Sequence, residues 1–270
     1  MNARSALFDL YGDHLRARGG RAPIAALVRL LAPLDIAAPA VRTAVSRMVR
    51  QGWLRPVRLP EGAGYALTPK AVQRIDDALA RIYRTRSEDW DGRWHVLVLS
   101  RIGERGARDR LRDALGFLGY AALDDTTWIS PRRSEEVDGL LAADGVRAER
   151  FTAEHDGDSA GLVQRLWDLE GLGRSYQRWM AEAEGLTAQA GVDPGDEMAF
   201  AVRSRLLHEW RKFLFRDPGL PRILLPSDWP GDKAAAFFDS ESRRLLPGAV
   251  RFVDSCLASK ADPITSPEHS

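Results

Sequence analysis

The stretch Pro39-Ala40-Val41-Arg42-Thr43-Ala44-Val45-Ser46-Arg47-Met48-Val49-Arg50-Gln51-Gly52 decides the fold of the N-terminal part of this 270-residue chain. Proline suits a first helical position, which needs no N–H partner, and glycine is typical just past a helix end. One narrow apolar stripe at helical spacing consists of Val41, Val45, Met48 and Val49. The opposite face carries only cations and small hydroxyls, namely Arg42, Thr43, Ser46, Arg47 and Arg50. Such side chains contact phosphates and the acceptor edges of guanine, so the stretch predicts a DNA recognition helix.

The flanking sequence predicts a winged helix-turn-helix. The expected elements are a helix over residues 23–31, a tight turn at 32–35, the recognition helix, strands at 54–59 and 64–67 around a hairpin loop, and a helix after Thr68-Pro69. Arg55 and Arg58 lie on the first strand of the hairpin and are the predicted wing contacts to DNA. The alternative is that these arginines form only a solvated surface.

Charge is distributed unevenly along the chain. Residues 1–87 hold 15 Lys and Arg against 6 Asp and Glu, a net charge of +9, while the remainder carries −8 and the whole chain +1. A basic module on an acidic body is expected when only one part meets nucleic acid. We therefore expect double-stranded DNA to bind the N-terminal module alone.

The rest of the chain predicts an α+β protein with two further domains. Residues 88–156 follow the order β-α-β-β-α-β of a ferredoxin-like sandwich, after a winged helix-turn-helix domain at residues 1–87. Residues 157–270 lack strand patterns and predict an all-α domain with a disordered tail from about residue 260. Within it we expect one long helix from Leu162 to Met180, bent near Gly171-Leu172-Gly173, and a last helix interrupted at Pro247-Gly248.

Composition points to a cytoplasmic protein. Cys256 is the only cysteine, so no intrachain disulfide is possible, and we expect it to be a buried, inert thiol. No apolar run approaches membrane-spanning length. Charged residues at Arg4, Asp9 and Asp13 come too early for a signal peptide.

Several motifs together resemble the PaaX family of phenylacetate-catabolism repressors. They are Arg4-Ser5-Ala6-Leu7-Phe8-Asp9-Leu10-Tyr11-Gly12-Asp13, Ala40 to Met48 with Gln51-Gly52-Trp53-Leu54, Trp90-Asp91-Gly92-Arg93-Trp94, Trp128-Ile129-Ser130-Pro131, His208-Glu209-Trp210-Arg211-Lys212-Phe213, Asp217-Pro218-Gly219-Leu220-Pro221 and Asp228-Trp229-Pro230. The resemblance covers nearly the whole chain. It implies a dimeric bacterial repressor whose DNA binding is relieved by an aryl-coenzyme A thioester, typically phenylacetyl-coenzyme A. The wing tip, Glu61-Gly62-Ala63-Gly64, is short of basic residues.

Two features are candidates for effector binding. The glycine-rich basic segment from residue 101 to 108 contains Arg101, Arg105 and Arg108 between a strand and a helix N-terminus, where anions are favoured. An aromatic set could line a flat pocket for an aryl group, with Trp179 and Trp210 as its main members beside Trp167 and Tyr176. The alternatives are solvated loop arginines and ordinary core packing of the aromatic side chains.

An enzyme is the less favoured class. The middle domain resembles the ferredoxin-like fold of the CRISPR adaptation endonuclease, in which a carboxylate at the end of the first strand binds a metal. Here Ser100-Arg101-Ile102 occupies that place, and Asp109 and Asp113 fall on the following helix. The five histidines show no metal-ligand spacing. We therefore expect no catalysis, no metal and no cofactor, and keep three alternatives: an effector-independent regulator, an architectural DNA-binding protein and a metal-dependent nuclease-like enzyme.

Overall fold

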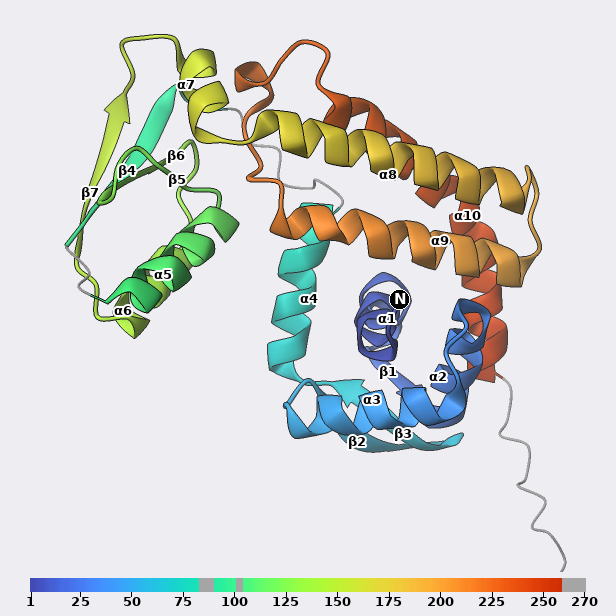
Figure 1. Ribbon diagram of the computed structural model, residues 1–270. Coiled ribbons are helices and arrows are strands. Elements are labelled where there is room, and N and C mark those ends of the chain that lie inside the picture. The colour runs from blue at the N-terminus through green and yellow to red at the C-terminus, as the bar shows by residue number, and fades with distance from the viewer. Residues whose placement is uncertain (83–89, 101–103, 259–270) are drawn as a thin grey trace, which may run out of the picture. The chain divides into compact units, whose positions relative to one another are not determined.

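A computed structural model describes residues 1–82, 90–100 and 104–258 (Figure 1). The chain forms two compact units, and each is discontinuous in sequence. The first unit combines Met1–Thr85, Trp179–Arg211 and Ala235–Ser270, and the second combines Arg86–Arg178 and Lys212–Ala234. The linear division into domains 1–87, 88–156 and 157–270 stays a prediction.

The first unit contains the predicted helix-turn-helix and hairpin. Its N-terminal elements are α1 (Ala3–Leu10), a π-helical turn (Tyr11–Leu15), β1 (Arg21–Pro23), α2 (Ile24–Leu31), α3 (Ala38–Arg50), β2 (Leu54–Leu59), β3 (Gly62–Leu67) and α4 (Pro69–Ile82). The strands form an antiparallel sheet in the order β1-β3-β2. Helix α3 ends at Arg50, and Gly52 then adopts a left-handed φ of 71°, as its position after the helix predicts.

The hydrophobic core of the first unit draws on both ends of the chain. Helix α1 lies between α2, α3 and α9 (Asp196–Trp210) (Figure 1). Leu7 and Val41 from the N-terminal elements share one buried cluster with Phe200 of α9 and Val253 of α10 (Pro230–Ala258). Helices α9 and α10 therefore complete the core on which α3 rests.

The second unit holds a four-stranded antiparallel sheet with the order β5-β6-β4-β7. Its elements are β4 (Arg93–Leu99), α5 (Arg105–Phe117), β5 (Ala121–Ala122), β6 (Thr127–Ser130), α6 (Glu136–Ala143) and β7 (Ala148–Glu154). The order matches the predicted β-α-β-β-α-β arrangement. Leu97 and Leu99 of β4 pack against Leu111 of α5 and Leu141 of α6, so both helices cover one face of the sheet. The predicted α+β class is confirmed.

The first predicted helix of the C-terminal region is two helices. Helix α7 (Ser159–Leu166) ends before Trp167, and α8 (Leu169–Ala190) begins two residues later. The predicted bend near Gly171-Leu172-Gly173 is wrong because Asp168 caps the new helix: its Oδ1 accepts the Gly171 N–H at 2.8 Å. The glycines lie in the first turns of α8.

Helix α10 runs without a break through Pro247, so the predicted interruption at Pro247-Gly248 is also wrong. The glycine serves a packing contact rather than a turn: a Cβ there would lie 2.8 Å from the Cβ of Ala199 in α9. Ala249 and Val253, which follow, are completely buried. This packing outweighs the cost of a proline inside the helix. The predicted disordered tail from about residue 260 lies outside the described residues.

None of the helices in the described part of the chain is long and apolar enough to cross a membrane.

Candidate nucleic-acid interface and ligand cavities

Helix α3 buries one apolar stripe and exposes its polar side chains. The buried stripe consists of Val41, Ala44, Val45 and Met48. All five predicted base-reading or phosphate-contacting residues are exposed: Arg42, Thr43, Ser46, Arg47 and Arg50. The helix is therefore held from one side and presents a polar face whose side chains are free to reach a ligand.

The arginines of this face have no acidic partner among the described residues. Elsewhere most arginines that contact a carboxylate do so within 3 Å, as Arg205 does with Asp35 at 2.9 Å. Asp35 precedes α3 in the turn, where its φ of 60° places it in the left-handed region. Because Asp35 is paired with Arg205 and α3 itself contains no acid, the positive potential of α3 is not cancelled locally.

The wing places its two predicted arginines on opposite faces of β2. Side chains alternate along a strand, so Arg58 shares a face with Leu54, which belongs to the core, and Arg55 points to the other face. Arg55 and Arg21 both pair with Ala66, from β2 and β1 respectively, and therefore flank it on the outer face. Arg21 was not identified from the sequence because only the pairing of β1 with β3 brings it beside Arg55.

A buried polar network joins α1 and the following turn to α9. Arg203 donates two hydrogen bonds to Asp13, at 2.9 and 2.6 Å, and both side chains are 5% exposed. It also donates to the Ser242 carbonyl at 2.6 Å. His208 Nδ1 lies 2.9 Å from Asp9 Oδ2. The network fixes α1 and the following turn to α9 and α10.

His14 lies at the edge of this network and is almost completely buried. Its Nε2 is 3.2 Å from Asp13 Oδ2 but lacks the alignment of a hydrogen bond. Burial lowers the pKa of His14 to about 4, against the opposing influence of Asp13. The imidazole is therefore neutral at physiological pH.

The predicted effector residues are dispersed. Arg101 lies outside the described residues. Arg105 and Arg108 line a cavity of about 140 Å³, together with Asp109, Arg112 and Trp128 among others. This space is large enough for one phosphate group and too small for a coenzyme.

The predicted aromatic residues are mostly in the interior. Trp179 and Trp210 are 5% and 4% exposed, and their rings meet at 4.8 Å with Trp210 stacked on Phe238 at 4.9 Å. Neither lines the cavity beside Arg105 and Arg108 or either of the two hollows described next. Trp167 is the exception, since it lines a groove of about 700 Å³ in the second unit.

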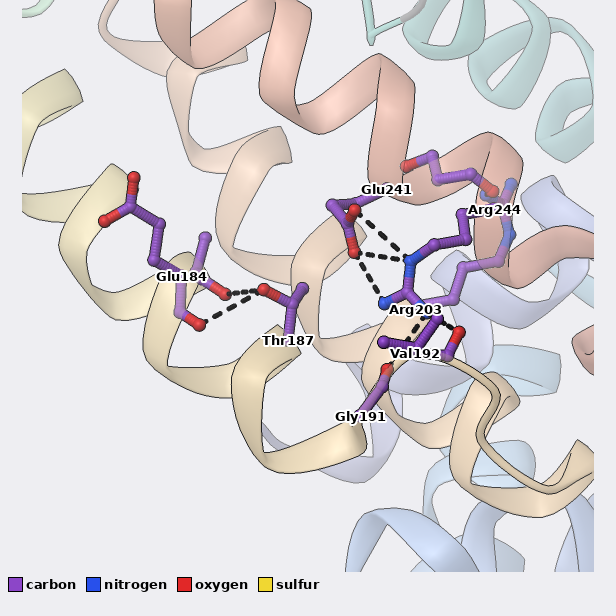
Figure 2. Close-up of polar contacts among 9 residues, drawn as sticks. Glu184, Thr187, Gly191, Val192, Arg203, Glu241 and Arg244 are labelled. Atoms are coloured by element: carbon purple, nitrogen blue, oxygen red, sulfur yellow. Dashed lines mark hydrogen bonds and ion pairs between the residues drawn. The ribbon is translucent and has the colours of Figure 1, made fainter.

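A third hollow, of about 390 Å³, lies beside the loop between α8 and α9. Arg244 of α10 lines it and donates to the carbonyls of Gly191 and Val192, at 3.1 and 2.8 Å (Figure 2). Glu241 pairs with the same guanidinium at 2.7 Å. Arg244 therefore secures the loop, and its charge is already satisfied.

The described residues contain no group of three or more His, Cys, Asp or Glu able to hold a metal ion. Cys256 is buried, and this burial raises the pKa of its thiol.

Comparisons with known proteins cover nearly the whole chain. Family models match it in three segments: "PaaX-like protein" at residues 2–71, "PaaX protein central Cas2-like domain" at 87–162 and "PaaX-like protein C-terminal domain" at 167–255. The transcriptional repressor PaaX of Escherichia coli strain K12 is 29% identical over 264 residues, which are 94% of this chain and 83% of that protein. The solved structure of the uncharacterized protein Rv0674 from Mycobacterium tuberculosis is 27% identical, with a TM-score of 0.65 over 94% of this chain and 98% of that one.

Proposed function

This chain belongs to the PaaX-like family, and we propose that it is a DNA-binding transcriptional repressor of an aromatic-acid catabolic operon of the phenylacetate type. One observation carries the proposal: α3 exposes three arginines and two hydroxyls above a buried stripe, with no acidic partner among the described residues. Such a surface suits the phosphates and guanine edges of a major groove. The family assignment favours a repressor over an enzyme.

The repressor acts as a cytoplasmic homodimer in this proposal. One recognition helix reads too few base pairs for useful specificity, so two copies bind a pseudo-palindromic operator. Arg42 and Arg47 read bases from the exposed face of α3, and Thr43, Ser46 and Arg50 position the helix. Arg55 and Arg58 add phosphate contacts from the wing.

An aryl-coenzyme A thioester such as phenylacetyl-coenzyme A releases the repressor from its operator. A ligand achieves this only by binding the DNA-free conformation more tightly. Arg105 and Arg108 support an anion contact because they line one small cavity and are exposed, and Arg101 is the third proposed contact. The anions that these arginines would contact are the phosphates of coenzyme A.

The test measures DNA binding by the full-length protein. Operator sequences are selected from a random duplex library, and their affinity is compared with that of unselected DNA at one salt concentration. Arg42→Ala and Arg47→Ala should each weaken operator binding by about 1–3 kcal/mol if bidentate to guanine, whereas Arg58→Ala should weaken specific and non-specific binding alike. Arg251→Ala, a change to an exposed arginine of α10 that pairs with Asp196, is the matched control.

Unchanged affinity in a folded Arg42→Ala/Arg47→Ala double variant would contradict the assignment of α3. Selection without any enrichment would favour an architectural DNA-binding protein. Phenylacetyl-coenzyme A should dissociate the complex at concentrations where phenylacetate does not; equal effects of the two compounds would remove coenzyme A from the proposal.

A further inference from the structure

We propose that the groove between the α7–α8 turn and residues 226–230 binds the aryl and pantetheine portions of the thioester. The nucleotide phosphates remain outside this groove. The inference rests on the effector proposed above and assigns it a place of which the sequence indicated only Trp167. Residues that line the groove and carry the argument are Gln164, Arg165, Trp167, Gly173, Gln177 and Trp229.

The groove has the size and rigid walls of a small-molecule site. Its volume of about 700 Å³ lies within the usual range for such ligands. Trp167 stacks on the buried Trp94 of β4 with ring centroids 6.2 Å apart. Trp229 meets Tyr176 edge-on at 6.0 Å, and the Tyr176 hydroxyl donates to Asp217. Both indoles are thus supported from behind, so a flat apolar group meets surfaces that are already in position.

The charges of the groove do not favour a polyphosphate. Glu170 and Arg174 pair with each other, and Asp168 is used in capping α8. Arg165 and Asp228 remain without an ionic partner among the described residues, and their charges are opposite. The groove therefore offers no net positive charge to a nucleotide, whereas an uncharged arm enters it without electrostatic cost.

Hydrogen-bonding groups in the groove match an amide-containing arm. Gln164 and Gln177 are exposed, and their amides make no hydrogen bond to a described residue. Pantetheine carries two amides and the thioester adds a carbonyl, so each protein group can find a complementary partner.

Gly173 forms part of the groove wall and allows a direct test. A Cβ at this position would lie 3.7 Å from both Trp229 Cζ3 and Pro230 Cγ, which is ordinary van der Waals contact. Gly173→Ala should therefore be tolerated, while Gly173→Met extends a side chain into the space that the ligand would occupy. The two variants differ in how far they fill the groove.

The experiment titrates the full-length protein calorimetrically with phenylacetyl-coenzyme A and with phenylacetyl-pantetheine, which has no phosphate. Both compounds should bind, and phenylacetyl-coenzyme A should bind more tightly, because only its phosphates can contact the arginines proposed above. Gly173→Met should weaken both more than about tenfold and Gly173→Ala should not. A Gln164→Leu/Gln177→Leu double variant, changed only at exposed positions, should weaken both by roughly tenfold, as expected for lost hydrogen bonds.

The outcomes separate this site from the effector itself. Normal binding by folded Gly173→Met, or by the glutamine double variant if Gly173→Met does not fold, would overturn the groove alone. So would binding of phenylacetyl-coenzyme A without binding of phenylacetyl-pantetheine. If neither compound binds the wild-type protein, both the proposed groove site and the proposed effector are wrong. The proposal of operator binding is tested by a separate measurement and would still stand.

Discussion

Replacing Arg203 by methionine should destabilise the protein far more than replacing Arg205, two residues further along the same helix. The side chains of Arg203 and Asp13 are each 5% exposed and share two hydrogen bonds. Arg203 also donates a hydrogen bond to the Ser242 carbonyl. Methionine preserves much of the apolar stem but leaves the Asp13 carboxylate buried without its counter-ion. Removing one partner of such a pair costs about 3–5 kcal/mol, because the remaining charge stays desolvated.

The control pair, Arg205 and Asp35, consists of the same charged groups but is exposed to solvent. Arg205 contacts Asp35 at 2.9 Å, but Asp35 is 89% exposed and remains solvated after the change. Arg205→Met should therefore cost at most about 1 kcal/mol. At 2–4 °C per kcal/mol, Arg203→Met should lower the Tm of the first unit by roughly 6–20 °C.

Urea titration and scanning calorimetry measure this difference directly. An Asp13→Leu/Arg203→Met double variant provides the decisive comparison, since removal of both charges should restore most of the stability lost in Arg203→Met. Equal stability of Arg203→Met and Arg205→Met would refute the argument, as would a double variant less stable than Arg203→Met alone.

Two further predictions concern acid sensitivity and nuclease activity. Because the pKa of His14 is lowered to about 4, the unfolded chain binds the proton first as pH falls from about 6.5, and folding stability should drop by about 2 kcal/mol between pH 7 and pH 5. Urea unfolding of His14→Gln should lack this drop; an equal drop in the variant would exclude His14 as its source. The protein should leave duplex DNA, single-stranded DNA and RNA intact with Mg²⁺ or Mn²⁺, since its described residues gather no metal-binding acids. Cleavage that Asp109→Asn or Asp113→Asn abolishes would overturn this expectation.

The elements that the sequence predicted well are those specified by local patterns. The recognition helix has a stripe, a proline start and a glycine end within fourteen residues, and the structure places α3 at Ala38–Arg50. The order of the four-stranded sheet also follows from the succession of strands and helices. In both cases the information lies within a short segment or in the order of segments.

The features that the sequence did not reveal depend on contacts between distant segments. Pro247-Gly248 resembles a helix break, but the missing Cβ is needed because α9 passes at that point. Trp210 resembles a ligand contact and is instead buried against Phe238. Arg21 becomes a neighbour of Arg55 only through strand pairing. An apolar or basic residue does not by itself indicate which distant segment lies against it.

The discontinuous core of the first unit sets the order in which this protein can mature on the ribosome. Phe200, Ala249 and Val253 belong to the same cluster as Leu7 and Val41. The ribosome adds Val253 about 170 residues after the end of α4 at Ile82. At 5–20 residues per second this interval is roughly 10–30 s, during which the apolar side of the nascent DNA-reading module lacks part of its covering. A truncated translation product that ends before α9 therefore carries all of α3 but lacks the part of its core that α9 and α10 supply, and should bind DNA more weakly than the finished protein.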